Sequence, residues 1–124
     1  MKRLSNDFDF TLNENQSKSL IDSLQINQKY KVYLYQYGDI EGIGSEGYGR
    51  IGNQVCDCSD TNANVKGYNI HKIYGIQGDT IFIEADSLKL LSNITNYKII
   101  LKKNEYEFSQ KRNFKRINFS DICK

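Results

Sequence analysis

One segment of this chain, Lys29–Tyr37, alternates in character residue by residue, and this restricts that part of the chain to an extended conformation. Its aliphatic side chains, Val32 and Leu34, fall on one face of a strand. The opposite face is aromatic and holds Tyr33, Tyr35 and Tyr37. Because side chains of a strand point alternately to its two faces, the segment predicts a strand whose aliphatic face is directed to a core.

Similar strand-like segments recur further along the chain. Residues 69–76 and 80–85 predict two strands, and the Gln-Gly-Asp sequence at 77–79 between them has the composition of a hairpin turn. A single helical turn is expected after Asp86 or Ser87. Further strands are expected at 97–103, 106–108 and 114–119.

The N-terminal part has a helical pattern instead. Thr11 and Glu14 match a capping box, in which each side chain satisfies a free backbone amide of the first helical turn. Apolar residues then follow at helical spacing, namely Leu20, Ile21 and Leu24. The sequence therefore predicts one short helix at about 13–25.

Together these segments predict an α+β domain that is mainly antiparallel β. One N-terminal helix precedes a curled sheet or a small, partly open β-barrel, because curling or closing a sheet hides its edges. The length of 124 residues and the 39% apolar fraction fit a single domain over 1–124. Residues 1–10 are mostly polar, with two phenylalanines, and are expected to form a flexible arm.

The three cysteines are an odd number, and the first ten residues lack the apolar core of a signal peptide. Both observations favour reduced cysteines and a cytoplasmic location. The residues Lys, Asn, Ile, Tyr and Phe, whose codons are AT-rich, are abundant, which favours an AT-rich genome such as that of a low-GC bacterium or its phages.

Six of the nine glycines lie between Gly38 and Gly52. Residues 42–47 satisfy the pattern GxGxxG, but the helix that a dinucleotide-binding fold places directly after it is missing from the sequence. The region is therefore predicted to be a loop or an irregular hairpin. It has either a structural role or a role in gripping a ligand, and in the second case Tyr48 and Arg50 supply the stacking and polar groups.

Two other surfaces are candidates for ligand binding. The aromatic face of 29–37 is a second packing surface, a homodimer interface or a ligand platform that uses Tyr33 and Tyr35. In the basic C-terminal segment, Arg112, Phe114 and Arg116 point the same way in an extended chain. An aromatic ring between two guanidinium groups can stack on a base while the arginines hold phosphates. The alternative is an edge strand that its charges keep soluble.

Catalysis and metal binding are disfavoured. The chain has one histidine, His71, so a nucleophile–histidine pair has only that residue to use. The potential zinc ligands Cys56, Cys58, His71 and Cys123 lack the spacing of a structural site, and residues 60–71 fail the calcium-loop pattern at its glycine and glutamate positions. No metal, cofactor or catalytic residue is assigned.

The sequence favours a non-catalytic binding protein. Its ligand is expected to be anionic: a nucleotide, a nucleic acid or an acidic protein surface. The small size and lack of motifs are typical of inhibitors and sequestering modules of phages and mobile elements, and a homo-oligomer is expected. The alternatives are a small β-barrel that binds nucleic acid and an enzyme that uses His71.

Overall fold

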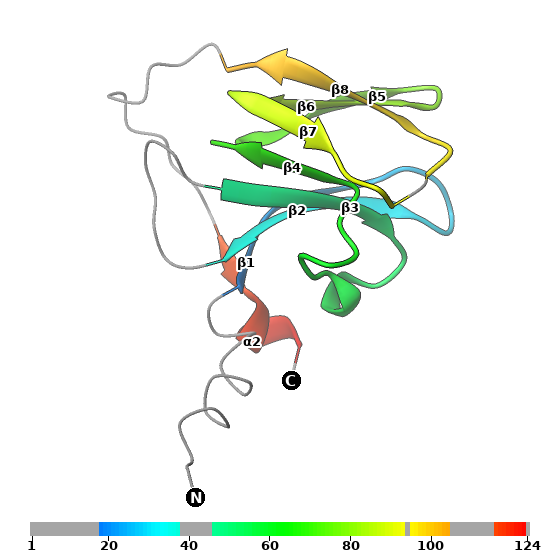
Figure 1. The fold of residues 1–124 in the computed structure, drawn as a ribbon. Coiled ribbons are helices and arrows are strands. Elements are labelled where there is room, and N and C mark those ends of the chain that lie inside the picture. Colours follow the sequence, from blue (N-terminus) through cyan, green and yellow to red (C-terminus); the bar gives the residue numbers. More distant parts are fainter. Residues whose placement is uncertain (1–17, 38–45, 94, 105–115, 124) are drawn as a thin grey trace, which may run out of the picture.

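The computed structural model describes residues 18–37, 46–93, 95–104 and 116–123 (Figure 1). These residues form nine strands in two sheets, with two short helical turns at Val55–Asp57 and Phe119–Ile122 (α2). The strands are β1 (Lys18–Gln25), β2 (Lys31–Tyr37), β3 (Glu46–Gly52), β4 (Val65–Tyr68), β5 (Lys72–Gln77), β6 (Thr80–Ala85), β7 (Ser87–Leu90), β8 (Lys98–Lys103) and β9 (Ile117–Asn118). No helix in this described part is long and apolar enough to cross a membrane.

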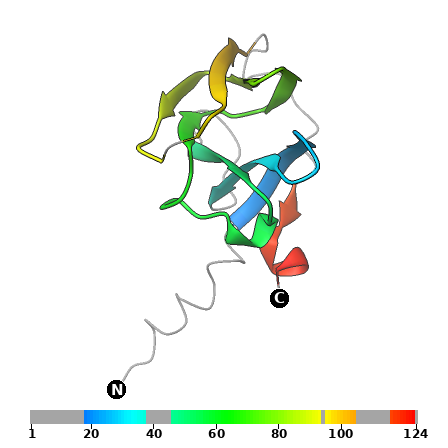
Figure 2. The ribbon, with the colours of Figure 1, turned by 90° about the vertical axis from the view of Figure 1, so that its right-hand side faces the viewer.

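The large sheet has the strand order β7-β4-β3-β2-β1-β9, and each of its neighbouring pairs is antiparallel. The small sheet has the order β5-β6-β8, in which β6 and β8 are parallel. Figure 2 shows the small sheet covering one face of the large one. The prediction of mainly antiparallel β structure is confirmed, and the described strands form two sheets without a closed barrel.

The two sheets are joined by one long, bent hairpin. β5 and β6 pair around the turn at Gly78, whose φ of 61° suits a glycine. The same two chain segments then continue into β4 and β7, which pair with each other in the large sheet. Only Asp86 separates β6 from β7. The two strands of the hairpin therefore pass from one sheet to the other side by side, at the bend next to Asp86.

Side chains satisfy the polar groups that this bend exposes. Asn69 sits at the bend with a φ of 54° and donates from its amide to a carboxylate oxygen of Asp86. The other Asp86 oxygen accepts from Asn104 Nδ2 at 2.9 Å, and the same nitrogen reaches the Asn69 carbonyl at 2.9 Å. The bend is therefore fixed by this side-chain network together with backbone hydrogen bonds across it, from the Asp86 amide to the Tyr68 carbonyl and from the His71 amide to the Glu84 carbonyl.

The main hydrophobic core lies between the sheets. It consists of Val32, Leu34, Val65, Ile70, Ile73, Ile81, Ile83 and Ala85. A hydrogen bond also links the two sheets, because the backbone amide of Ile73 in β5 donates to Asp22 Oδ2 in β1 at 2.8 Å.

A second core covers the opposite face of the large sheet. It consists of Tyr33, Tyr35, Cys58, Ala63 and Phe119. The Tyr35 hydroxyl donates to the Ser59 carbonyl at 2.6 Å, and its ring centroid lies 6.1 Å from that of Phe119. The segment 53–64 and α2 thus cover the aromatic face of β2, which makes it a packing surface within the chain.

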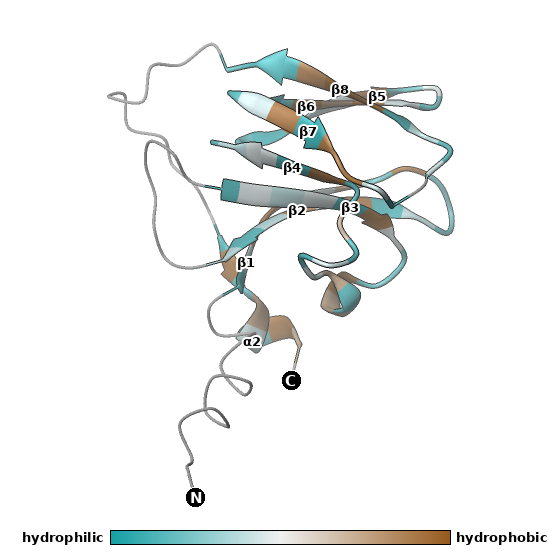
Figure 3. Ribbon diagram, in the orientation of Figure 1, coloured by the Kyte–Doolittle hydropathy of each residue, from teal (hydrophilic) through white to brown (hydrophobic). Residues whose placement is uncertain are grey.

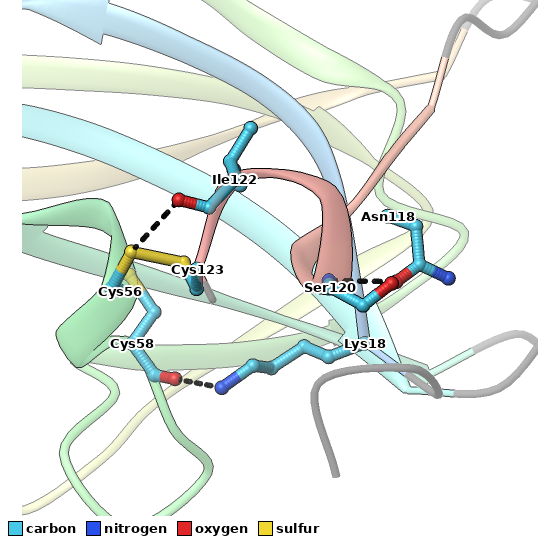
Figure 4. Close-up of a disulfide and its surroundings, with 7 residues drawn as sticks. All are labelled: Lys18, Cys56, Cys58, Asn118, Ser120, Ile122 and Cys123. Carbon is cyan, nitrogen blue, oxygen red and sulfur yellow. Dashed lines mark hydrogen bonds between the residues drawn. A yellow bond between two sulfur atoms is a disulfide. The ribbon is translucent and has the colours of Figure 1, made fainter. Parts of the chain in front are cut away.

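A disulfide between Cys56 and Cys123 joins the two pieces that form this cover (Figure 4). Beside it, the buried ammonium of Lys18 donates to the Cys58 carbonyl and lies 4.7 Å from the Phe119 ring centroid. Cys58 is a buried free thiol. The prediction of three reduced cysteines is therefore wrong for Cys56 and Cys123. The cytoplasmic location stays a prediction, and it loses the support of the reduced cysteines.

The predicted N-terminal helix is wrong over the part that the structure describes, because Lys18–Gln25 is strand β1. A β-bulge between Leu20 and Asp22 shifts the register with β2. Before the bulge, Leu20 pairs with Tyr35 and packs on the second core. After it, Asp22 and Leu24 pair with Leu34 and Val32, so they share the main-core face on which Ile21 packs. Ile21 and Leu24 thus lie on one face although they are three residues apart, a spacing that is typical of a helix. The expected arm 1–10 and the capping box lie outside the described residues.

One other local prediction is wrong, because the helical turn expected after Asp86 or Ser87 is strand β7. For the glycine-rich region, which was predicted to be a loop or an irregular hairpin, the structure shows a hairpin pairing: residues 46–52 form strand β3, antiparallel to β2. Residues 38–45 lie outside the described part of the chain.

Candidate functional site

Strand β3 points Gly47 and Gly49 toward the main core and its polar residues away from it. A Cβ on Gly49 would lie 2.8 Å from Val65 Cγ2, and one on Gly47 would lie 3.2 Å from Ile70 Cδ1. Both positions need glycine so that the neighbouring side chains can pack closely. The alternate positions of the strand are therefore on the outer face of the large sheet, and they are Glu46, Tyr48, Arg50 and Gly52.

The register of the large sheet places lysines and tyrosines next to Tyr48 on this outer face. Lys66 lies directly opposite Tyr48, and Lys89 lies opposite Lys66 on the next strand. Tyr68 lies opposite Glu46 in the adjacent row. Directly paired residues share a face of a sheet, so these side chains form one surface. We call it the tyrosine–lysine patch, and it consists of Tyr37, Tyr48, Lys66, Tyr68 and Lys89.

The ring of Tyr48 is held by two other tyrosines. It stacks on the buried Tyr35 ring at a centroid distance of 5.8 Å and an interplanar angle of 25°. It meets the Tyr37 ring edge to face, at 5.8 Å and 90°. Tyr68 is more open, with 47% of its surface exposed. The patch therefore presents one orientationally fixed aromatic ring and one accessible ring.

The patch carries more positive than negative charge. The Lys66 ammonium lies 3.2 Å from Glu46 Oε2, and this hydrogen bond raises the pKa of Lys66. Burial, followed by the nearby Glu46 charge, raises the pKa of Tyr48, so its phenol stays neutral at physiological pH. Lys89 is exposed. The patch itself contributes two ammonium groups, and the carboxylates of Glu46 and Asp60 lie beside it. Because Lys66 is paired with Glu46, the exposed Lys89 is the group best placed to attract an anion.

The structure uses the other predicted site residues near this surface in packing and in holding the covering segment. Tyr33 and Tyr35 are buried in the second core, at 5% and 0% exposure, so their rings are not accessible to a ligand in this conformation. Arg50 Nη1 donates to the Asp57 carbonyl at 2.9 Å and so holds the covering segment. Of the residues predicted around the glycine-rich region, only Tyr48 belongs to the patch.

The C-terminal candidates are not near Tyr48, as far as they are described. Arg112 and Phe114 lie outside the described residues. Arg116 directly precedes β9, which forms one edge of the large sheet, whereas Lys89 belongs to β7 at the opposite edge. The structure therefore does not join Arg116 and Tyr48 in one site, and phosphate binding by the C-terminal segment stays a prediction.

Sequence reasoning missed Lys66, Tyr68 and Lys89 because these residues come next to Tyr48 only through the pairing of strands that are distant in the sequence. A signal for the first two was present. Lys66-Gly67-Tyr68 repeats the alternation of polar residue and glycine that Glu46-Gly47-Tyr48 shows. In both strands the glycine packs against Ile70 of the main core. Two such triplets predict paired strands with their functional side chains on the outer face.

The groups considered for catalysis and metal binding are used in packing. His71 Nδ1 lies 2.6 Å from Glu84 Oε1, and the His71 amide donates to the Glu84 carbonyl at 2.8 Å. Burial raises the pKa of the Cys58 thiol to about 12, which disfavours the reactive thiolate. No group of three or more potential metal-ligating side chains occurs among the described residues.

Comparisons of this chain with protein-family models, with curated proteins and with solved structures find no match. The geometry of the patch is therefore the basis for assigning a function.

Proposed function

We propose that this chain is a non-catalytic binding protein whose ligand is a nucleotide or a short single-stranded nucleic acid. The observation that carries the proposal is the position of Tyr48, a ring fixed by Tyr35 and Tyr37 with Lys66 directly opposite it. An aromatic ring on a sheet surface can stack on a base, while neighbouring lysines attract its phosphates. Binding of this kind is sufficient for a small sequestering module or inhibitor of the phage or mobile-element type, which needs no catalytic group.

The contributions of the two residue types can be separated. Stacking of one base on an aromatic side chain contributes about 1–3 kcal/mol and is tolerant of base identity. Lysine contacts with phosphates release counterions, so their contribution falls as salt rises. An acidic protein surface would share the salt dependence, and tyrosines also anchor protein interfaces. Direct binding of an oligonucleotide that depends on Tyr48 therefore distinguishes the two ligand classes.

The test uses the full chain and a fluorescein-labelled oligo(dT) of about a dozen nucleotides, a length within the usual site sizes. Fluorescence anisotropy gives the dissociation constant at several salt concentrations. Replacing Tyr48 with Leu keeps an apolar side chain but removes the stacking ring, and Tyr68→Ala removes the accessible one. Each change should weaken binding about 5- to 150-fold. Lys89→Gln should reduce the salt dependence by about one phosphate contact.

Tyr74 supplies the matched control. It is an exposed tyrosine, at 55%, and the Lys102 ammonium lies 4.8 Å from its ring centroid. It belongs to β5 in the small sheet, so Tyr74→Ala should leave the affinity unchanged. The proposal fails if oligo(dT) binds equally well to wild type and Tyr48→Leu, or if Tyr74→Ala has the larger effect. Thermal melts of each variant show whether the fold is retained.

A further inference from the structure

The small sheet has an open edge at β8. Among the described residues, β8 pairs only with β6, in a parallel ladder. The amides of Lys98 and Asn104 donate to Asp79 and Ala85 on the β6 side. Backbone groups alternate in direction along a parallel ladder, so those of Ile99, Leu101 and Lys103 point away from β6. They form a row to which another strand can be added.

An apolar cavity lies beside this edge. Its volume is about 510 Å³, and its walls come from the end of β7, the connection that follows it and the start of β8. Ile100 and Leu101 are 44% and 36% exposed, and Leu90 across the cavity mouth is 65% exposed. Figure 3 shows these hydrophobic stretches of β7 and β8 in brown. An added strand with apolar side chains on its inner face would cover Leu101 and the cavity, whereas Ile100 lies on the outer face of β8 with Lys98 and Lys102.

The same edge is basic. β8 has the sequence KIILKK and contains no acidic residue, and the exposed Lys89 lies on nearby β7. Lys98 and Lys102 pair with Thr80 and Glu84 on the outer side of the small sheet, the side away from the inward Ile81 and Ile83. An added strand therefore fits best when acidic side chains occupy its outer face and apolar ones its inner face.

One segment of this chain has that pattern. Residues 6–12 read Asn-Asp-Phe-Asp-Phe-Thr-Leu, so Asp7 and Asp9 fall on one face of an extended chain and Phe8 and Phe10 on the other. The segment lies among residues 1–17, outside the described part. We propose that residues 6–12 of one copy add as a strand to the β8 edge of a second copy, so that two chains exchange their N-terminal segments.

Chain length favours a second copy over the same copy. Residue 12 and Lys18 are six residues apart, and a link of this length spans about 21 Å at full extension. Figure 1 shows β8 at the end of the molecule opposite α2 and the start of β1. Addition to the β8 edge of the same copy would need this short link to cross the molecule, whereas the edge of a second copy carries no such requirement.

Exchange of the segments replaces one predicted interface with another. The sequence predicted a homo-oligomer held by the tyrosine face of β2, but Tyr33 and Tyr35 of that face are buried within the chain. The β8 edge offers apolar surface, complementary charge and, as far as the described residues go, backbone groups without a ladder partner. This inference uses neither Tyr48 nor Lys66, so a failure of nucleotide binding would leave it unaffected, and its own failure would leave nucleotide binding unaffected.

Charge reversal of the full chain tests the proposal by sedimentation equilibrium. One variant carries Asp7→Lys and Asp9→Lys, and the other carries Lys98→Glu and Lys102→Glu. Like charges would then face each other in both contacts of each homodimer, which should weaken the dimer about a hundredfold or more. An equimolar mixture of the two variants restores opposite charges in both contacts, so a heterodimer should form.

Lys29→Glu with Lys31→Glu is the control, because these exposed lysines flank the start of β2, away from β8. This variant should remain a dimer. A wild-type monomer at about 100 μM, a concentration at which a specific interface is normally occupied, would overturn the proposal. Dimers that survive both reversals, or variants that stay monomeric when mixed, would also overturn it. Circular dichroism of each variant confirms that the fold is retained.

Discussion

Replacing Gly67 with Ala tests the idea that glycines let the strands of this protein approach closely. A Cβ on Gly67 would lie 2.3 Å from the Ser87 carbonyl oxygen and 2.7 Å from Leu88 Cδ2. The first of these atoms is backbone in β7, so relief of the contact requires the β4–β7 ladder to move. Overpacking of this kind costs about 1–3 kcal/mol, and displacement of backbone places the expected loss at the upper end.

Gly75→Ala is the matched control. A Cβ on Gly75 meets nothing within 4 Å, and its φ is not in the left-handed region. Alanine there should be neutral or should stabilise the fold by up to about 1 kcal/mol, because it restricts the unfolded chain. Urea unfolding followed by tyrosine fluorescence measures both changes. Equal stability of the Gly67→Ala and Gly75→Ala variants would refute the close-approach reasoning.

Three further predictions follow from the covered face and the bend. Cys123→Ser removes a disulfide with a sequence separation of 67 residues and should lower stability by about 2–4 kcal/mol in thermal melts, with no such loss when both proteins are reduced. Burial raises the pKa values of Cys58 and Tyr35 above those of the unfolded chain. Above about pH 9 the unfolded state therefore binds fewer protons than the folded state. Urea titrations should then show the free energy of unfolding falling by up to about 1.4 kcal/mol per pH unit for each group. Asp86→Ala leaves its two asparagine donors without their carboxylate acceptor and should cost about 1–3 kcal/mol, whereas Asp79→Ala in the exposed turn should cost little in the same assay.

The elements that sequence reasoning predicted correctly are those whose local pattern agrees with their surroundings. Lys31–Tyr37 forms β2, and the hairpin of β5 and β6 turns at Gly78. In these segments alternation, β-branched side chains and turn residues all favour the same structure. The alternation in β2 does not reveal that both of its faces are buried, because aliphatic and aromatic side chains pack equally well on two cores.

The elements that it missed depend on contacts between distant parts of the chain. Nothing near Leu20 in the sequence indicates the bulge that reverses the faces of β1. The glycines of β3 are unfavourable for a strand by local propensity, and only their contacts with Val65 and Ile70 explain them. The odd cysteine count did not reveal the disulfide, because Cys56 and Cys123 come together only when α2 packs on the large sheet.

For the candidate site, the sequence indicated Tyr48 but not its neighbours, and the structure of β3 accounts for both outcomes. Its inward positions 47 and 49 are glycines that let Val65 and Ile70 pack closely, and its outward Tyr48 packs against the second core. Arg50 is used to hold the covering segment, which leaves Glu46 and Tyr48 facing Tyr68 and Lys66. A tyrosine that stacks on a buried ring and also reaches the surface is held in place before a ligand arrives. Such preorganisation reduces the entropy lost on binding, and it is the physical reason for placing the ligand at Tyr48 instead of at the more exposed tyrosines of this chain.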